Sequence, residues 1–423
     1  MMHVLLRQAR VHDPQSGFHN QVVDIFIEDG MIREIGRRLD VRADNVIEGK
    51  DLQVSPGWVD VFADYREPGF EQKETIATGL AAAAAGGFTQ VLLAPNTQPA
   101  LDNKSAIQYV LRQAHGHAVV LRPLGAVSQR VEGKELAEML DMYHYGAVAF
   151  TDGWKPVQNP NLMLKALEYV KAFGGIVLQL PVDQLLSAGG LMHEGPVSTR
   201  LGMAGIPELA ETLMVHRDIE LLRYTGSKLH LTGISSAASV DMIRRAKEEG
   251  LQITCSVTPY HLALTDEALA GYSSLYKVTP PLRSEIDRQA LIAGLKDGTI
   301  DCIASHHRPQ EWDAKAKEFE YAAAGMNIQQ IAFAVAWDAV RKQVGHERLI
   351  EALTAVPRTI FGIGHNGLRQ GDEAELTIFT FAADTMLTTE NNQSASMNNP
   401  FAGKPLAGKV IGTIRHTFVQ LNQ

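Results

Sequence analysis

Short runs of consecutive apolar residues recur eight times along the middle of the chain, at residues 58–64, 89–95, 118–126, 147–152, 176–181, 229–234, 252–259 and 300–306. Continuous apolar runs are typical of parallel strands that are buried on both faces. Helical patterns lie between most of these runs, the clearest at residues 73–87, 134–146, 162–175, 237–250 and 288–298. This alternation predicts an α/β fold, a (β/α)8 TIM-type barrel, with a doubly wound open sheet as the alternative.

The two ends of the chain have a different pattern. Residues 1–54 and 368–423 alternate roughly with period two between apolar and polar positions, and Asp29-Gly30 is a typical hairpin turn. Because chain termini often lie close together, we expect both ends to form one small β-sandwich domain. Residues 55–367 would then be the barrel.

Composition and charge narrow the possible partners. The chain has 39 basic and 48 acidic residues among 423, a net charge of −9, which argues against nucleic acid and anionic membrane. The only cysteines, Cys255 and Cys302, have no short CxxC spacing, so neither a disulfide framework nor a cysteine-rich zinc site is expected. No uncharged apolar run approaches the roughly 20 residues of a membrane helix. We therefore expect a cytoplasmic protein.

Candidate chemistry belongs at the carboxyl ends of the predicted strands, where the active sites of such barrels lie. The first strand ends in Asp60, Phe62, Asp64 and Arg66, and the later strands end in Asn96, Asp152, Gln179, Gly233 and the pair His306-His307. Adjacent strand residues point to opposite faces, so the two histidines do not easily bind one ion.

Several motifs around these positions resemble the dihydroorotases of the amidohydrolase superfamily, in the class fused to or complexed with aspartate carbamoyltransferase. They are PGWVDVFADYREPGFEQKETIATG, LLAPNTQPALD, AFTDGWKPVQN, EGPVSTRLGMAGIPELAE, KLHLTGISSAASV, TPYHL, PPLRSEIDRQALIAGLKDGTIDCIASHHRP and GDEAELTIF. They span essentially the whole chain in order. The resemblance implies an amidohydrolase-type barrel with a small β domain built from both chain ends. It also implies the reversible ring closure of N-carbamoyl-aspartate to dihydroorotate, with zinc as the family's metal.

The family's metal and proton-transfer pattern is largely missing from this sequence. The pattern has an HxH on strand one, a carboxylate on strand four, a histidine each on strands five and six, and an aspartate ending strand eight. The matching positions here hold Phe62, Asp64, Asp152, Gln179, Gly233 and His306. Phenylalanine and glycine offer no donor to zinc, so we expect no metal, no cofactor and no catalytic residue. A metal site rebuilt from Asp64, Asp152, Gln179 and His306 is the alternative.

The substrate-binding pattern is half retained. Arg66 and Asn96 match residues that hold the substrate carboxylate in the family, whereas Thr279 and Gln310 depart from the family pattern. Arg66 and Asn96 are therefore expected to be a substrate-binding remnant, or alternatively to be structural, with Arg66 paired to Asp64 or Asp152.

These observations favour a catalytically inactive dihydroorotase homologue. We expect a non-catalytic subunit that supports the assembly of aspartate carbamoyltransferase in pyrimidine biosynthesis, with the catalytic chain of that enzyme as partner and with homo-oligomers. One alternative is an active dihydroorotase, or another cyclic-amide hydrolase, with an atypical metal site. A weaker alternative is a ligand-sensing regulatory subunit.

Overall fold

A computed structural model describes residues 2–364 and 367–422. Eight parallel strands form its central sheet: β6 (Trp58–Ala63), β7 (Phe88–Leu93), β8 (Val120–Gly125), β9 (Ala149–Phe150), β10 (Val177–Gln179), β13 (Leu229–Leu231), β14 (Ile253–Val257) and β15 (Cys302–Ile303). The strand order runs without interruption from β6 to β15. A parallel bridge between Ala63 and His307 joins the two edges of the sheet. The predicted barrel is thus confirmed, and the open sheet is excluded.

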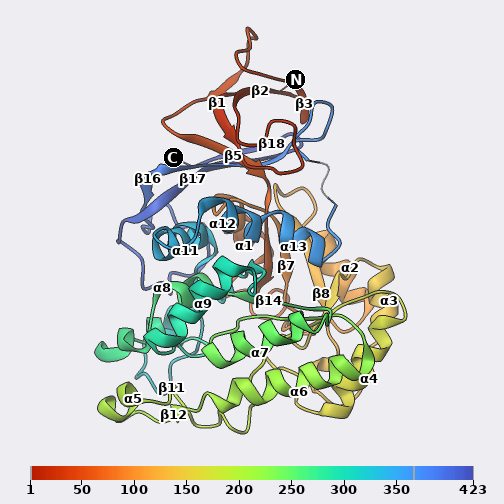
Figure 1. The fold of residues 1–423 in the computed structure, drawn as a ribbon, viewed down its shortest axis with the longest axis vertical. Helices are drawn as coiled ribbons and strands as arrows, with labels where there is room; N and C mark the ends of the chain where they lie inside the picture. The colour runs from red at the N-terminus through yellow and green to blue at the C-terminus, as the bar shows by residue number, and fades with distance from the viewer. Residues whose placement is uncertain (1, 365–366, 423) are drawn as a thin grey trace.

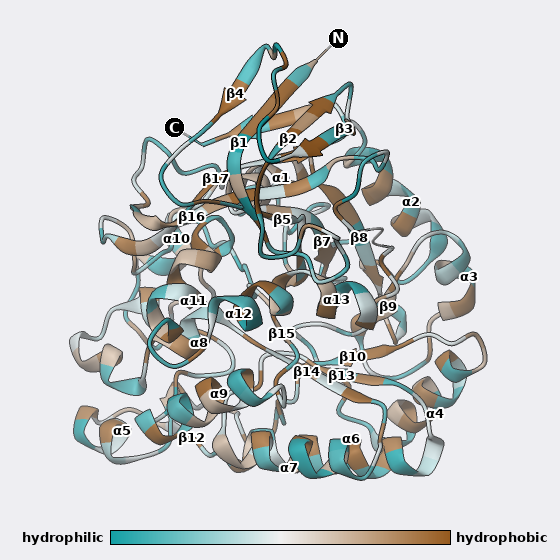
Figure 2. Cartoon of the chain, turned by 45° about the horizontal axis from the view of Figure 1, so that its top comes forward, coloured by the Kyte–Doolittle hydropathy of each residue, from teal (hydrophilic) through white to brown (hydrophobic). Residues whose placement is uncertain are grey.

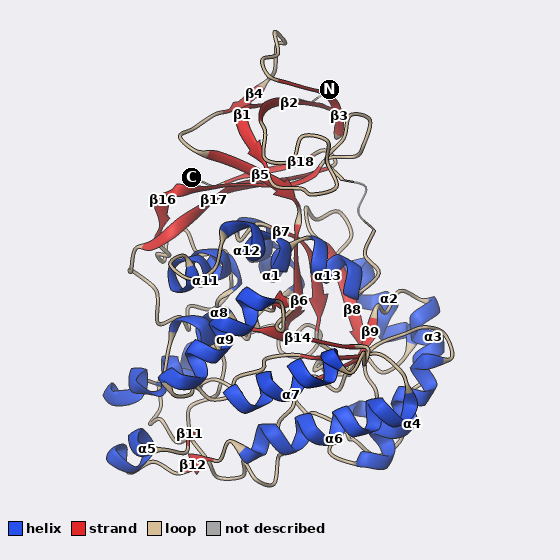
Figure 3. Ribbon diagram, in the orientation of Figure 1, coloured by secondary structure: helices blue, strands red, loops and turns tan. Residues whose placement is uncertain are grey.

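Helices surround the barrel on the outside (Figures 1 and 3). They are α1 (Ile76–Ala85), α2 (Lys104–Gln113), α3 (Met139–His144), α4 (Pro160–Lys171), α6 (Leu209–Thr225), α7 (Ala237–Glu248), α9 (Glu285–Asp297), α11 (Ala332–Val340), α12 (His346–Leu353) and α13 (Ala355–Ile360). Shorter pieces are α5 (Pro196–Leu201), α8 (Pro259–Ala263) and α10 (Trp312–Lys315). Local sequence explains several starts: the side chains of Thr75, Asn103, Asn159, Ser236 and Ser284 cap α1, α2, α4, α7 and α9.

Both chain ends contribute to a second, mixed sheet at the top of the molecule (Figure 1). Its strands are β1 (His3–Val11), β2 (Val22–Glu28), β3 (Met31–Gly36), β4 (Asn45–Ile47), β5 (Leu52–Pro56), β16 (Glu375–Thr385), β17 (Leu406–Arg415) and β18 (Phe418–Leu421). The N-terminal and C-terminal parts meet where β5 pairs antiparallel with β16. The exact domain boundaries, at residues 54 and 368, remain predictions.

Burial follows the hydropathy of the sequence. The central strands are mostly apolar, while the outer helices α6 and α7 alternate between polar and apolar faces (Figure 2). The two cysteines are free and buried within the barrel, and burial raises the pKa of both thiols. Within the described ranges, no helix is long and apolar enough to cross a membrane.

Candidate functional site at the barrel mouth

The backbone is strained where the first and last barrel strands end. Arg66 follows β6 with a φ of 62°, and His306 follows β15 with a φ of 49°. Residues other than glycine rarely adopt this left-handed conformation, and it is concentrated at functional sites. The two residues lie at the carboxyl ends of strands that are bridged to each other, so their strain marks one place in the fold, the barrel mouth.

A packed aromatic cluster forms the floor of this site. The ring of Phe62 lies 4.8 Å from that of His306, and the Trp154 ring lies 5.1 Å from Phe62 and 5.4 Å from His306. A Cβ atom built on Gly233 would lie only 2.4 Å from Cε1 of His306. The His306 ring therefore occupies the space beside residue 233, the position at which the family pattern has a histidine.

His306 is held at one end of a buried chain of hydroxyl and imidazole groups. Its Nε2 lies 2.8 Å from Oγ1 of Thr232, which contacts Oγ of Ser256 at 2.9 Å, and Ser256 in turn contacts Nε2 of His230 at 3.1 Å. Burial lowers the pKa of His306 well below its ordinary value and that of His230 to about 3. Both imidazoles are therefore neutral at physiological pH. Nδ1 of His306 is buried without a hydrogen-bond partner among the described residues.

The buried carboxylate of Asp64 lies beside two arginines. Neither of its oxygens has a hydrogen-bond partner in the described part of the chain, although Oδ2 lies 3.4 Å from Nη1 of Arg66. Burial raises the pKa of Asp64, while the positive charges of Arg66 and Arg308 act in the opposite direction. The Arg308 guanidinium stacks 4.3 Å above the ring of Trp154. Arg66 is thus paired with Asp64 and not with Asp152, one of the two pairings the sequence suggested.

Asn96 holds the loop that carries Trp154. Its Oδ1 accepts a hydrogen bond of 2.9 Å from the Trp154 backbone N–H, and its Nδ2 donates one of 3.0 Å to the carbonyl of Asp152. The amide also lies so close to Gly153 that a Cβ there would be 2.0 Å from Oδ1. Asn96 consequently positions the loop, and the guanidinium groups are the charged donors of the site. Its match to a carboxylate-binding residue stays a prediction.

Two other positions that match metal ligands of the family, Asp152 and Gln179, form hydrogen bonds with neighbouring loops. Asp152 accepts hydrogen bonds from the backbone N–H and hydroxyl of Ser128 at 2.9 and 2.5 Å, and burial raises its pKa to about 6. Gln179 exchanges two hydrogen bonds with the backbone of Val157. No group of three or more His, Cys, Asp or Glu side chains in residues 2–364 and 367–422 is arranged to hold a metal. The described residues therefore do not fit the family's zinc.

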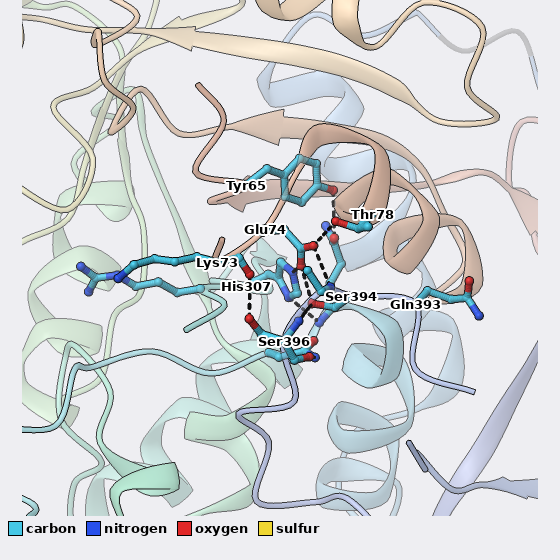
Figure 4. A network of polar contacts seen from close by, with 12 residues as sticks. Tyr65, Lys73, Glu74, Thr78, His307, Gln393, Ser394 and Ser396 are labelled. Carbon is cyan, nitrogen blue, oxygen red and sulfur yellow. Dashed lines mark hydrogen bonds and ion pairs between the residues drawn. The ribbon is translucent and has the colours of Figure 1, made fainter. Parts of the chain in front are cut away.

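His307 belongs to a polar network with Glu74 (Figure 4), separate from the contact of His306 with Thr232. Its Nδ1 accepts from the backbone N–H of Gln329, and Nε2 lies 3.2 Å from the carboxylate of Glu74. Glu74 also accepts hydrogen bonds from the hydroxyls of Thr78 and Ser394. Because Ser394 belongs to the segment between β16 and β17, this network fastens the chain's C-terminal part to the barrel mouth.

Two residues of the site were missed by sequence reasoning, Trp154 and Arg308. Trp154 lies two positions beyond the strand-four carboxylate, and Arg308 lies two positions beyond His306. Both follow closely after barrel strands, at the end of the barrel where active sites lie, and this position was the available indication.

A closed parallel barrel, a polar site at its mouth and a β domain formed by both termini together define an amidohydrolase-type barrel protein. Solved structures agree on the fold: an L-hydantoinase (dihydropyrimidinase) from Arthrobacter aurescens has a TM-score of 0.85 at 22% identity over 100% of this chain and 98% of its own. A D-hydantoinase structure has a TM-score of 0.83 at 20% identity, over 100% of this chain and 95% of its own.

The sequence comparisons are more specific. A family model described as dihydro-orotase-like matches residues 52–239. A curated protein of Syntrophus aciditrophicus named dihydroorotase is 41% identical over 98% of both chains. Dihydroorotases of Acetivibrio thermocellus and Anaeromyxobacter dehalogenans are 40% and 42% identical, covering 97% of this chain and 97% and 96% of their own. The chain belongs to the dihydroorotase family.

These relatives correct one expectation. The interpretation of the chain as a catalytically inactive assembly subunit of aspartate carbamoyltransferase is wrong, because relatives matching nearly its full length are named dihydroorotases. That interpretation rested on a few strand-end positions, whereas the similarity extends over 97% to 98% of the chain. The comparisons favour the enzyme alternative.

Proposed function

We propose that the chain is a dihydroorotase, or a closely related cyclic-amide hydrolase, whose site departs from the family's metal pattern. The observation that carries the proposal is the full-length similarity to proteins named dihydroorotase, 41% identical in the first case. Support from the site itself is the buried carboxylate of Asp64, whose Oδ2 lies 3.4 Å from Nη1 of Arg66, the arginine that matches the family's carboxylate-binding residue.

The chemistry proposed for this chain's own residues is ring opening by water. Arg66 holds the ligand carboxylate, and Asp64 takes a proton from water as the water oxygen bonds to the ring amide carbon. The carbon–nitrogen bond breaks, the proton passes from Asp64 to the departing nitrogen, and the new carboxylic acid releases its own proton to the solvent and becomes a carboxylate. The raised pKa of Asp64 suits this role, because burial makes the carboxylate a stronger base than an exposed one.

Hydrolysis of L-dihydroorotate by the purified chain, followed chromatographically, tests the proposal. We expect a rate above buffer that falls at least a hundredfold in Asp64→Asn, in line with the usual contribution of a positioned proton-transfer group. Asp141→Asn, on the exposed face of α3, is the matched control. The assay is run with and without added zinc. No rate above buffer in either condition refutes the proposal.

A ligand-sensing regulatory role is the second candidate. One observation favours this role. The guanidinium groups of Arg66 and Arg308 lie at the barrel mouth, where the described residues do not form a zinc site. In that case L-dihydroorotate or N-carbamoyl-L-aspartate binds to the chain in calorimetry, and neither is converted.

The partner and location remain predictions. Association with an aspartate carbamoyltransferase catalytic chain is tested by co-purification, and self-association is tested by sedimentation. A cytoplasmic location and the absence of nucleic-acid and membrane partners rest on the sequence arguments above.

A further inference from the structure

Arg308 differs in kind from the other strand-end residues. The family's strand-eight pattern, DHAPH, has alanine at this place, whereas the chain has His306-His307-Arg308-Pro309-Gln310. The half-buried Arg308 side chain lies over the ring of Trp154 at 4.3 Å, and its Nε is buried without a hydrogen-bond partner among the described residues. A guanidinium stacked on an aromatic ring is oriented in advance and presents its donors edge-on.

Two guanidinium groups share one carboxylate at the mouth. Arg66 and Arg308 both interact with Asp64, the negative group that they share. Burial lowers the pKa of Arg308 to about 10, the positive charge of Arg66 acts in the same direction, and Asp64 acts to raise it, so Arg308 stays charged at neutral pH. Around Asp64, two guanidinium groups thus share one carboxylate, which leaves a guanidinium for a ligand carboxylate. Nε of Arg66 is likewise buried without a hydrogen bond among the described residues.

We infer that Arg308, stacked on Trp154, is a second carboxylate-binding group, which makes the barrel mouth selective for an open-chain dicarboxylate over its cyclic monocarboxylate. This inference rests on the proposed function for the ligand class. Closing the ring consumes one carboxylate, so the open form has two anionic groups for the two guanidiniums. Arg66 binds the carboxylate that is present in both the open and the cyclic form. Arg308 binds the carboxylate that is present only after ring opening. Planar guanidinium groups bind carboxylates through paired hydrogen bonds.

Isothermal titration calorimetry with N-carbamoyl-L-aspartate and L-dihydroorotate tests the inference at neutral pH. We expect the wild-type chain to bind N-carbamoyl-L-aspartate, the dicarboxylate, more tightly than L-dihydroorotate. Arg308→Ala, which installs the family residue, weakens binding of the dicarboxylate by about tenfold to a hundredfold and changes that of dihydroorotate by less than threefold. Arg308→Lys keeps the charge and recovers part of the selectivity. Arg200→Ala is the control, because Arg200 pairs with Glu267 on an exposed surface.

The test depends on the ratio of the two dissociation constants, for N-carbamoyl-L-aspartate and L-dihydroorotate, and not on either affinity alone. If Arg308 only neutralises Asp64, Arg308→Ala changes both affinities equally, and the inference is overturned. It is also overturned if the wild-type chain binds neither ligand or prefers dihydroorotate. Trp154→Leu gives a second route, since loss of the stack also reduces the preference for the dicarboxylate. The proposed function is tested separately, by turnover: a selective chain without turnover loses the proposed function and keeps this inference.

Discussion

Replacement of Gly233 by alanine tests whether the His306 ring fills the space beside this residue. Gly233 has a φ of 71°, and a Cβ there would approach Cε1 of His306 to 2.4 Å, closer than real Cβ contacts come. The backbone conformation alone costs an alanine about 1–2 kcal/mol. Overpacking against the buried imidazole adds about 1–3 kcal/mol. The free energy of unfolding should therefore fall by about 2–5 kcal/mol.

A double-mutant cycle separates these two costs. In a His306→Ala background the steric conflict is gone, so Gly233→Ala should cost only the backbone part, about 1–2 kcal/mol. Gly189 is the matched control, because its φ is 73° and nothing lies within 4 Å of a Cβ built there. Gly189→Ala should cost the same small amount in both backgrounds. The free energies come from urea unfolding followed by circular dichroism.

The result that would refute this reasoning is additivity. If Gly233→Ala costs the same with and without the His306 ring, the ring does not occupy the space beside residue 233. The packing argument for the floor of the site then fails, whatever the size of either single effect.

Three further predictions concern binding, pH and metal. Arg66→Ala should abolish the binding of both N-carbamoyl-L-aspartate and L-dihydroorotate in calorimetry, and an unchanged dissociation constant contradicts its role. Burial alone would raise the pKa of Glu74, but hydrogen bonds from His307 and Ser394 hold it below its ordinary value. The Glu74 carboxylate therefore stabilises the fold above about pH 4.5, and this contribution is lost as the pH falls through the lower pKa of the folded state. Glu74→Gln should lower the free energy of unfolding in urea at pH 7 and lower it much less near pH 3. An equal loss at both pH values contradicts this assignment. EDTA and added zinc should leave the thermal unfolding midpoint unchanged, since the described residues lack a ligand set; a zinc-dependent rise in the midpoint shows that a metal site exists.

The sequence predicted the barrel well because its strands are buried on both faces. Runs such as residues 58–64 and 89–95 fall on β6 and β7 almost residue for residue. Other predicted strands were longer than the observed ones. Residues 147–152 contain only the two-residue strand Ala149–Phe150. Apolar burial continues past the last paired residue, so hydropathy alone does not mark where pairing stops. The helix expected from residue 73 begins at Ile76 because the Thr75 side chain caps it.

The site was less predictable because its main contacts join distant parts of the chain. Gly233 and His306 could each be recognised as a departure from the family pattern. That the second fills the space beside the first is a relation between strands more than seventy residues apart, and no local pattern contains it. Arg308 could not be predicted as a site residue because an arginine near a strand end has many possible roles, and its stack on Trp154 joins two separate loops.

The residues that depart from the family pattern pack against one another. Phe62 packs on His306, His306 lies against Gly233, and Trp154 packs on both aromatic rings. Restoring a histidine at residue 233 alone would place its side chain in the space of the His306 ring, and restoring an aspartate at residue 306 alone would leave a cavity beside Phe62. A single reversion toward the metal pattern should therefore lower stability without creating a zinc site. The present floor is a packed alternative to the metal site, and the charge at the mouth comes from Arg66 and Arg308.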